Sequence, residues 1–588
     1  MVRMLFGAFV AVQTFVWLAR ADRFEVLFWW TGETWLYVLL LWIKDFALAA
    51  AAGFFAARLL ALTVKAAAPT ESAPPPLPRP AAEAAWVLAI LAAGILVRWA
   101  FRSSNPPGLW VDVVYVTRPL FGGAAVPFWG ASPYGEIPAS HEVLSHLYVA
   151  FARGVFALFG SGETGFFALS ALPGCLALPA GWWLAREATG PRTAGLALLL
   201  CALVGWPILL SRWTYYTILL LALVLLAAAA TLRARRTGSV GLAAFAGACV
   251  GLSLHTYAAA YAIAPAFAAF ALLEARERKK RRLVGTAAAA GLVAFAPLAW
   301  AFVAGEARLG GHLRDVHVGL TVRGENLPRV EGVFRVPVAV AWNTAKYTGV
   351  FLWTFDPEER HVGGRSVVTP AVGALALLGL GLAASRRRPA DVLLLLLAAA
   401  SILAGVLSNP GGAPNTLRIS GILAPAIVLA AAVLEIWIGC AVRNRVASRG
   451  VLIAGVAAAL FVWETLPALT GFPARPGVAL RLCAAETEAG RLLSRLAKAP
   501  VVVELGAVPY PIVVEAVAHG SDRTLPLDLY ARRTPAELRA APPAGPFWLL
   551  STRRGLATLA ARGFTCGRGI APAGEASGLV LARAKPPA

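Results

Sequence analysis

Residues 84–112 of the chain read AAWVLAILAAGILVRWAFRSSNPPGLWVD. The apolar run 84–101 is as long as a membrane-spanning helix needs to be, and the polar residues and the Pro-Pro-Gly turn after it predict the end of that helix. An acid, Asp112, follows the turn. We therefore expect Asp112 just outside the lipid, at the membrane–water boundary, where a carboxylate can act on a membrane-borne substrate.

The composition of the whole chain also indicates a membrane protein. Of its 588 residues, 59% are hydrophobic and 14% are charged, and the mean hydropathy is +0.69. A soluble protein of this size has too little interior to bury so much apolar surface. The sequence predicts a polytopic α-helical membrane protein.

The formal net charge of +22 is concentrated in short loops between apolar runs. These loops hold Arg233, Arg235 and Arg236, then residues 276–282, then Arg386, Arg387 and Arg388, then Arg443, Arg445 and Arg449. Basic loops between spans are typical of the cytoplasmic side of a membrane. No basic stretch is interleaved with aromatic residues on a soluble face, so we exclude nucleic acid as a partner.

Residues 84–470 are predicted to form a membrane core of about eleven spans. After the run 84–101, further apolar runs lie near 165–185, 193–211, 214–231, 240–255, 258–273, 283–304, 368–384, 391–407, 418–440 and 450–468. The segment 144–160, with His146 and Arg153, is amphipathic and is predicted to lie in the interface without crossing. When that helix is left out of the count of spans, every arginine-rich loop is predicted on the same side of the membrane. The long loops 102–164 and 306–366 then share the opposite, outer face.

Residues 1–66 are predicted to add about two spans, and the Pro- and Ala-rich residues 67–83 are expected to form a cytoplasmic linker. The apolar run 4–19 is predicted to be the first span, with a cleaved signal peptide ending near residue 21 as the alternative. Asp45 and Glu435 are expected near span ends, and no other acid is expected inside a span.

Residues 475–588 have a different character. Strand-like runs at 501–505, 547–550 and 579–581 alternate with helical segments near 479–497 and 555–562, which predicts a small periplasmic α/β domain. No catalytic or nucleotide-binding motif is found in it. Two of the six cysteines, Cys483 and Cys566, lie here, where the compartment allows a disulfide that the sequence does not require.

Several short motifs occur in an order that resembles one family. They are Pro-Pro-Gly-Leu-Trp-Val-Asp (106–112), Phe-Ala-Leu-Phe-Gly (156–160), Leu-Leu-Ser-Arg (209–212), Gly-Leu-Ser-Leu-His-Thr-Tyr (251–257), Asp-Pro-Glu-Glu-Arg-His (356–361) and Pro-Asn-Thr-Leu-Arg (414–418). Over roughly residues 84–470 the chain resembles the GT-C membrane glycosyltransferases, especially the group with the protein O-mannosyltransferases and the lipid A aminoarabinose transferases. The resemblance implies inverting transfer of a sugar from a polyprenyl-phosphate carrier to a lipid, glycan or protein acceptor at the periplasmic face of a bacterial inner membrane.

The resemblance also implies roles for individual residues. Asp112 matches the family's catalytic aspartate, which orients or deprotonates the acceptor hydroxyl. The family usually has Asp-Glu here and this chain has Asp112-Val113, which leaves the presence of a divalent metal open. His141 and Glu142, just before the amphipathic helix, are candidates for a second polar partner, and capping of that helix is the alternative.

Basic residues on the predicted outer face run against the positive-inside pattern and are candidate ligands of the donor phosphate. They are Arg212, Arg360, His361, Arg365 and Arg418. Contact with lipid headgroups is the alternative for each. Trp110 and Tyr257 are candidate sugar or acceptor contacts, and a place in the interfacial aromatic belt is the alternative for Tyr257.

Two other classes of function compete with the enzyme. One is a catalytically degenerate relative that binds a polyprenyl carrier without transferring a sugar, a hypothesis that Val113 sustains. The other is a transporter or flippase of lipid-linked glycans, which the lack of paired Gly/Pro-broken spans disfavours.

Overall fold

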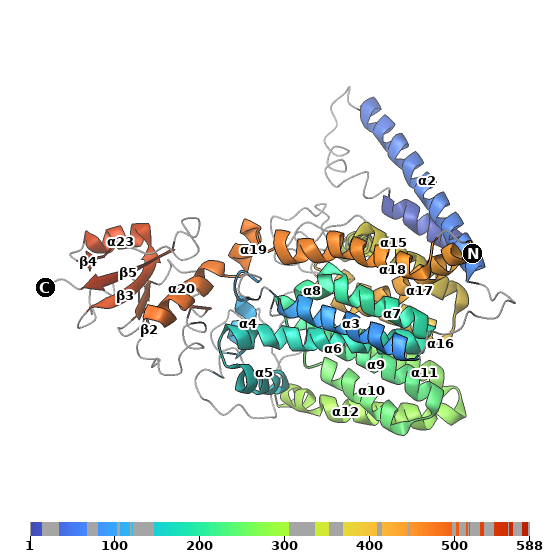
Figure 1. The fold of residues 1–588 in the computed structure, drawn as a ribbon, viewed down its shortest axis with the longest axis horizontal. Coiled ribbons are helices and arrows are strands. Elements are labelled where there is room, and N and C mark those ends of the chain that lie inside the picture. Colours follow the sequence, from blue (N-terminus) through green and yellow to red (C-terminus); the bar gives the residue numbers. More distant parts are fainter. Residues whose placement is uncertain are drawn as a thin grey trace.

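The computed structural model describes the greater part of the chain. The described residues are 2–14, 35–67, 80–100, 102, 106–117, 120, 146–213, 215–304, 335–351, 368–408, 414–444, 447–496, 501–504, 513–514, 517, 530–533, 546–561, 564–567 and 579–585. They form a long helical bundle with a small α/β domain at one end (Figure 1).

A helix occupies the place of every span predicted for the core. These helices are α3 (Pro80–Trp99), α6 (Glu163–Thr189), α7 (Pro191–Leu203), α8 (Gly205–Arg212), α9 (Thr217–Thr237), α10 (Val240–Ser253), α11 (Ala260–Ala275), α12 (Arg281–Val303), α15 (Pro370–Arg386), α16 (Pro389–Val406), α17 (Leu423–Arg443) and α18 (Arg449–Leu460). Within the described residues, seven helices are long and apolar enough to cross a membrane, and the bent pair α7 and α8 makes an eighth. The N-terminal residues add the helix Val2–Thr14 and the long helix α2 (Trp35–Ala66). The predicted fold class is confirmed.

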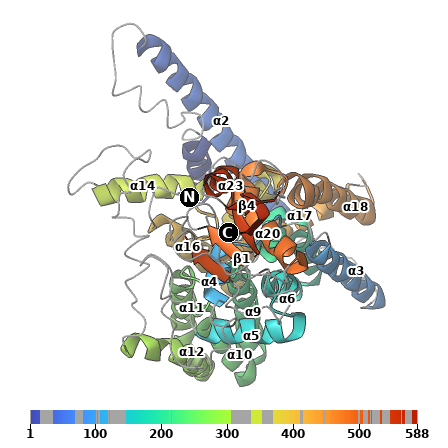
Figure 2. The ribbon, with the colours of Figure 1, turned by 90° about the vertical axis from the view of Figure 1, so that its left-hand side faces the viewer.

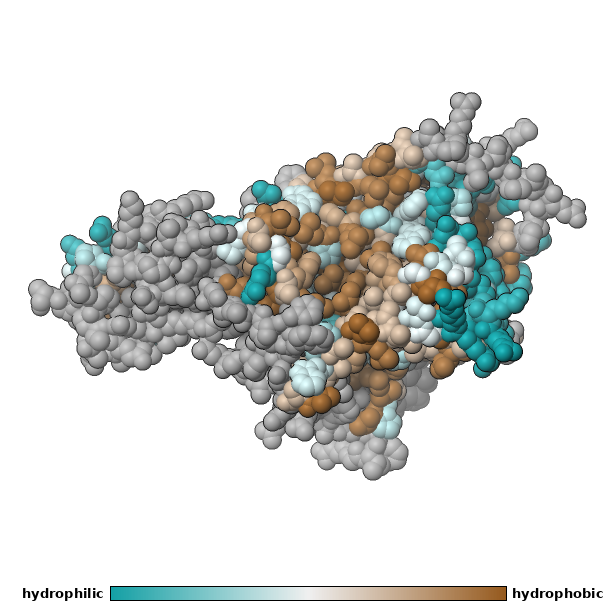
Figure 3. Space-filling view, turned by 90° about the horizontal axis from the view of Figure 1, so that it is seen from below, coloured by the Kyte–Doolittle hydropathy of each residue, from teal (hydrophilic) through white to brown (hydrophobic). Residues whose placement is uncertain are grey.

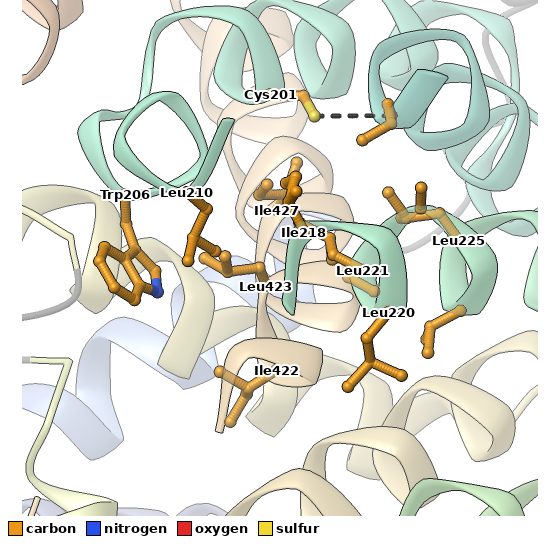
Figure 4. Packing of buried hydrophobic residues seen from close by; sticks show 14 of the residues in the cluster. Cys201, Trp206, Leu210, Ile218, Leu220, Leu221, Leu225, Ile422, Leu423 and Ile427 are labelled. Carbon is orange, nitrogen blue, oxygen red and sulfur yellow. Dashed lines mark hydrogen bonds between the residues drawn. The ribbon is translucent and has the colours of Figure 1, made fainter. Parts of the chain in front are cut away.

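The helices α9 and α17 lie at the centre of the bundle, and α12 lies at its edge. In the most apolar 18-residue windows, 78% of α9 residues and 83% of α17 residues are buried, against 17% in the span that contains α12. Figure 4 shows Ile218 and Leu221 of α9 against Leu423 and Ile427 at the start of α17. Most of the circumference of α9 is buried by the surrounding helices, and a stripe through Leu219, Leu223 and Leu226 is partly exposed.

The predicted span 193–211 is broken, which differs from the single helix expected. The helices α7 and α8 meet at Val204 with a bend of 54°. The cause is Pro207, since a proline lacks an N–H and its ring clashes with the carbonyl four residues earlier, here that of Leu203. The break frees the Leu203 carbonyl and the Gly205 amide from their helical partners.

A second helix supplies partners for the broken backbone. The Thr465 hydroxyl donates to the Leu203 carbonyl at 2.7 Å, and the Glu464 carboxylate accepts from the Gly205 amide at 3.0 Å. The same carboxylate accepts from the Thr369 amide just before α15, at 2.6 Å. Glu464 lies in the π-helical turn Phe461–Thr465 that follows α18. The expectation of no further acid inside a span was therefore wrong, because Glu464 is buried within one.

The arginine-rich loops share one end of the bundle, as predicted. Arg236 of α9 pairs with Glu187 of α6 at 2.8 Å, and Arg235 pairs with Glu274 of α11 at 2.7 Å. The opposite end holds the short helices α4 (Val111–Thr117) and α5 (His146–Phe159). With 14 residues, α5 reaches about 21 Å at a rise of 1.5 Å per residue and is too short to cross. Its Arg153 is exposed while Tyr148, Val149 and Ala152 are buried, as an interfacial helix requires.

Part of the long predicted loop 306–366 is helical. The helix α14 (Arg335–Thr348) packs against α16. Its Asn343 side chain donates to the carbonyls of Val406 and Ser408 at 3.0 and 2.7 Å, which satisfies the C-terminal end of α16. The sequence analysis missed this helix because its apolar residues are too few to indicate a span.

The C-terminal residues form the predicted small α/β domain. The helices α19 (Pro476–Arg481) and α20 (Ala484–Leu496) lead to a five-stranded sheet in the order β2-β1-β3-β5-β4. The strands are β1 (Val501–Glu504), β2 (Tyr530–Arg533), β3 (Phe547–Thr552), β4 (Thr565–Cys566) and β5 (Leu579–Lys585), with α23 (Arg553–Ala560) after β3. The first three pair in parallel and the last two antiparallel. Neither Cys483 nor Cys566 forms a disulfide in the described structure.

Replacing Glu464 by leucine is expected to lower the apparent Tm of the detergent-solubilised protein by several degrees. Two buried amides then lose their acceptor, and each such loss costs about 1–3 kcal/mol. The Tm of Glu464→Gln is expected to lie between those of the wild type and Glu464→Leu, because the amide oxygen of glutamine can still accept a hydrogen bond. The matched control is Glu435→Leu, which removes a partly exposed pair with Arg449. Equal losses of Tm in Glu464→Leu and Glu435→Leu would contradict the role given to Glu464.

Candidate functional site

Asp112 is the second residue of α4, at the end of the bundle opposite to the basic loops. The turn before it, Pro106-Pro107-Gly108, leads into Leu109 and Trp110, which are both buried. The backbone at Asp112 is thus placed where the sequence predicted, next to the end of a span; its side chain lies outside the described part of the chain. Val113, in the position of the family's second acid, is fully buried among apolar side chains.

An aromatic cluster surrounds the residues just before Asp112. It consists of Trp110, Tyr148, Tyr215, Tyr216 and Tyr257. Trp110 stacks on Tyr216 with ring centroids 5.5 Å apart and meets the edge of Tyr215 at 4.5 Å. Tyr216 also contacts Tyr148 at 5.9 Å and Tyr257 at 5.7 Å. The cluster joins α4, α5 and the turns after α8 and α10, so two residues that the sequence singled out separately, Trp110 and Tyr257, share one neighbour.

The predicted sugar contact Trp110 is therefore a packed residue. Its side chain is 3% exposed and its faces lie against two tyrosines. Tyr257 is only half-buried and keeps an accessible side. Of the two rings, that of Tyr257 is the more accessible.

Arg212 lies at the same end, but its guanidinium is turned into the protein. Both of its Nη atoms donate to carbonyls of the last turn of α3 and the residue after it, at 2.7 Å to Val97, at 2.9 Å to Arg98, and to Ala100. Its cationic carbon lies 5.6 Å from the ring centroid of Phe167. The predicted phosphate ligand Arg212 thus holds the C-terminal end of the helix that leads to the Asp112 turn.

A second buried arginine, Arg98, lies in α3 and bonds the end of another helix, α7. It donates to the carbonyls of Cys201 and Ala202 at 2.9 and 3.5 Å, at the end of α7, and to the Ser211 hydroxyl at 3.2 Å. Cations are stabilised at the negative ends of helix dipoles. The sequence analysis missed Arg98, whose signal is a lone arginine in the last turn of an otherwise apolar span.

Arg418 lies on the turn before α17 and is half-exposed. Hydrogen bonds to α14 and within the turn itself fix its conformation. The Tyr347 hydroxyl accepts from the Asn415 amide at 2.9 Å, and the Asn415 side chain accepts from the Leu417 amide at 3.1 Å. Tyr347 itself is fully buried against Gly405, where a Cβ would lie 2.5 Å from its ring. The Pro-Asn-Thr-Leu-Arg motif is therefore a fixed turn that presents a cation at this end.

The α/β domain holds the turn that leads to Asp112. The Thr487 hydroxyl of α20 accepts from the Leu109 amide at 3.1 Å. The backbone of Gly108 lies directly on the turn between α19 and α20, so that a Cβ at Gly108 would come within 2.2 Å of the Leu482 carbonyl oxygen. Figure 2 looks onto this end, with α20 and the sheet in front of the bundle. We call these contacts the α20 clamp.

An ion pair fastens α20 to the bundle beside the clamp. Arg491 of α20 binds both carboxylate oxygens of Glu163 at the start of α6, with its Nε at 2.7 Å, and also Glu488 at 2.9 Å. The hydrogen bonds that the Arg491 guanidinium donates to Glu163 and then to Glu488 raise its pKa, so it stays charged at every working pH. A bidentate arginine–carboxylate pair fixes direction as well as distance.

Three buried hydroxyls near the cluster have no hydrogen-bond partner among the described residues. They belong to Tyr148, Thr217 and Ser420. Thr217 follows Tyr216, and Ser420 begins the short 3-10 helix Ser420–Ile422, which packs on α9. Burial raises the pKa of the Tyr148 hydroxyl, which therefore remains a neutral donor. Sequence analysis missed all three, since isolated hydroxyls in apolar surroundings give no pattern.

The other predicted site residues lie outside the described part of the chain. They are His141, Glu142, Arg360, His361 and Arg365. Within the part that the structure describes, no three His, Cys, Asp or Glu side chains gather closely enough to hold a metal ion.

The described helices form a multi-pass bundle, with the short helices α4 and α5 and the small α/β domain at one end. The family model described as dolichyl-phosphate-mannose-protein mannosyltransferase matches residues 146–300, from α5 to α12, about a quarter of the chain. No curated protein matches the chain in sequence.

Two solved structures of ArnT from Cupriavidus metallidurans share the fold. The form bound to undecaprenyl phosphate is 14% identical, with a TM-score of 0.51, and the apo form is 14% identical, with a TM-score of 0.52. Each comparison covers 85% of this chain and 98% of ArnT. The predicted resemblance to the GT-C superfamily is confirmed.

Gly108→Ala is expected to release the Asp112 turn from the α20 clamp. The added Cβ cannot fit beside the Leu482 carbonyl, so the turn must move away. Hydrogen exchange of the peptide 106–117, followed by mass spectrometry, should become faster at least tenfold. The matched control is Gly154→Ala in α5, where a Cβ meets nothing within 4 Å. Unchanged exchange in Gly108→Ala would show that the clamp does not order the turn.

Proposed function

We propose that the protein is a membrane glycosyltransferase that moves a sugar from a polyprenyl-phosphate carrier to an acceptor at the end of the bundle where α4 lies. The observation that carries the proposal is the convergence at this end, in a GT-C fold, of the clamped Asp112 turn, the aromatic cluster and the fixed Arg418 turn. These parts come from segments hundreds of residues apart in the chain.

The proposed chemistry is an inverting displacement with Asp112 as the base. The acceptor hydroxyl gives its proton to the Asp112 carboxylate while its oxygen forms a bond to the anomeric carbon of the sugar. The bond between that carbon and the phosphate oxygen breaks, and polyprenyl phosphate leaves with the bonding electrons. His141 and Glu142 are proposed to assist Asp112, because they precede α5, whose Tyr148 joins the aromatic cluster.

The leaving phosphate needs cations, and Arg418 is the proposed ligand. Its turn is rigid and its side chain is half-exposed, so it can meet a lipid phosphate at the membrane surface. Arg360, His361 and Arg365 of the preceding loop are proposed to complete the set. For Arg212 we propose a positioning role, because its Nη donors already bind the carbonyls at the end of α3.

The carrier is proposed to be a polyprenyl phosphate of the undecaprenyl class, since the solved ArnT with this fold was bound to undecaprenyl phosphate. We place the site and the α/β domain in the periplasm of a bacterial inner membrane, because the basic loops lie at the opposite end of the bundle. A lipid, a glycan and a protein all remain candidate acceptors, and Tyr257 is the proposed contact to sugar or acceptor.

The second candidate function is carrier binding without transfer. Val113 favours it, because the family's second acid is replaced by a buried apolar residue. Glu464 does not support the transporter hypothesis, although this acid lies inside a span. Two backbone amides occupy its carboxylate and tie three helices together, as a structural group does.

Asp112→Asn is expected to reduce sugar transfer from a radiolabelled polyprenyl-phosphate sugar by about 10²–10⁴-fold, the usual contribution of a general base. The measurement uses purified protein in native lipid and a panel of donors, with carrier binding measured in parallel. Binding should survive, because the substitution keeps the shape of the side chain. Transfer that is equal in both proteins would remove Asp112 from the mechanism, and carrier binding without any transfer by the wild type would favour the degenerate binder.

Arg418→Gln is expected to weaken binding of polyprenyl phosphate by about tenfold or more, since a charge-assisted hydrogen bond contributes about 1.5–3 kcal/mol. The matched control is Arg387→Gln, an exposed arginine at the opposite end of the bundle. Binding is measured by titration with the carrier in detergent. Equal affinities of the two variants would exclude Arg418 as a phosphate ligand.

A further inference from the structure

A cavity of about 400 Å³ lies between α9, α10, α11 and α12, away from the site described above. Its walls are almost entirely small or apolar, and they include Ala243, Val250, Phe267, Ala288 and Leu292. This volume is within the range of ligand pockets, roughly 300–1,000 Å³. A cavity of this size in a membrane bundle can hold a ligand.

The shape of the cavity fits a single hydrocarbon chain. Its lining runs along α10 from Ala243 to Leu254, which corresponds to about 16 Å at a rise of 1.5 Å per residue. That length is about half of the ~30 Å hydrocarbon core of a bilayer, or one leaflet. Access is from the lipid, because α12 lies at the edge of the bundle and its Leu292 and Val293 are exposed.

Close contact of α10 and α12 sets one wall. A Cβ at Gly247 would lie 1.9 Å from the Ala287 carbonyl oxygen, and one at Gly251 would lie 2.3 Å from that of Gly291. These glycines therefore bring the two backbones together and leave the space on the α11 side unfilled. The cavity is thus a consequence of small side chains along one helix pair.

The polar end of the cavity is basic. Glu274 lines it and is bonded to Arg235 at 2.7 Å and to Lys280 at 2.8 Å, so this acid is already neutralised. The adjoining stretch 276–282 holds six basic residues and one acid, and Arg278, Lys279 and Arg282 are exposed. Figure 3, seen from the side of α12, shows apolar side chains along the bundle and hydrophilic ones gathered at its right-hand end.

We propose that this cavity binds one acyl chain of an anionic glycerophospholipid, whose phosphate lies against the basic stretch 276–282. The charge of this stretch selects an anionic headgroup, since juxtamembrane Lys and Arg side chains attract anionic lipid. The site lies in the leaflet next to the basic loops. It is distinct from the proposed donor site, which lies at the other end of the bundle.

The test titrates the full-length protein, purified in a mild detergent, with phosphatidylglycerol and, separately, with phosphatidylcholine, and counts bound lipid by native mass spectrometry. One phosphatidylglycerol is expected to bind about tenfold more tightly than phosphatidylcholine. Ala288→Leu, which fills the cavity, is expected to weaken binding of both lipids by tenfold or more. The matched control is Ala289→Leu, the next residue of α12, which is exposed like Ala288 but does not line the cavity.

A second pair of variants tests the headgroup. Arg278→Gln with Lys279→Gln should reduce phosphatidylglycerol binding to the level of phosphatidylcholine, whereas Arg387→Gln with Arg443→Gln, the same change of charge in other loops, should leave it unchanged. Equal binding by the Ala288→Leu and Ala289→Leu variants would overturn the location. Equal affinity of the wild type for the two lipids would overturn the anionic headgroup. Displacement of phosphatidylglycerol by undecaprenyl phosphate would overturn the proposed occupant and assign the cavity to a polyprenyl carrier.

Discussion

A backbone amide or carbonyl inside a bilayer must find its partner within the protein, because lipid offers none. This requirement is most demanding where α7 breaks at Val204. There the chain uses Glu464 and Thr465 to bond the freed amide and carbonyl, and Glu464 also bonds the start of α15. The break is what turns α8 toward the functional end, so the position of Arg212 and the aromatic cluster depends on two polar side chains from a distant helix.

The same requirement explains why the bundle contains two buried arginines. Arg98 and Arg212 bond the carbonyls at the ends of α7 and α3, and so each helix end is closed by a cation from another helix. The C-terminal ends of helices carry partial negative charge, and this charge balances the two arginines as carboxylates do in an ion pair. Together with the α20 clamp, the arginines fix the direction in which the chain leaves α3 and reaches Asp112.

Much of the fold could be predicted from the sequence because length and apolarity decide which segments enter lipid. The spans, the interfacial helix α5 and the small α/β domain follow from periodicity and composition. The break at Val204 has a local cause in Pro207, a signal that the sequence analysis overlooked. The role of Glu464 could not be predicted, since its partner Gly205 is 259 positions away in the chain. At the site, the sequence indicated Asp112, Tyr257 and Arg418 by motif. It did not indicate that Trp110 and Arg212 are packed into the protein, because burial is a property of the assembled helices.

The α20 clamp has a consequence for the order in which the molecule is made. The Leu109 amide and the Thr487 hydroxyl that holds it are 378 positions apart in the chain. The ribosome completes the whole membrane bundle before it reaches α20, so the turn that bears Asp112 acquires its final support as one of the last events of synthesis. A chain that stops early, or that loses its C-terminal part to proteolysis, can hold every span and still lack an ordered Asp112 turn. The Asp112 turn is therefore fully supported only in a chain that extends through α20.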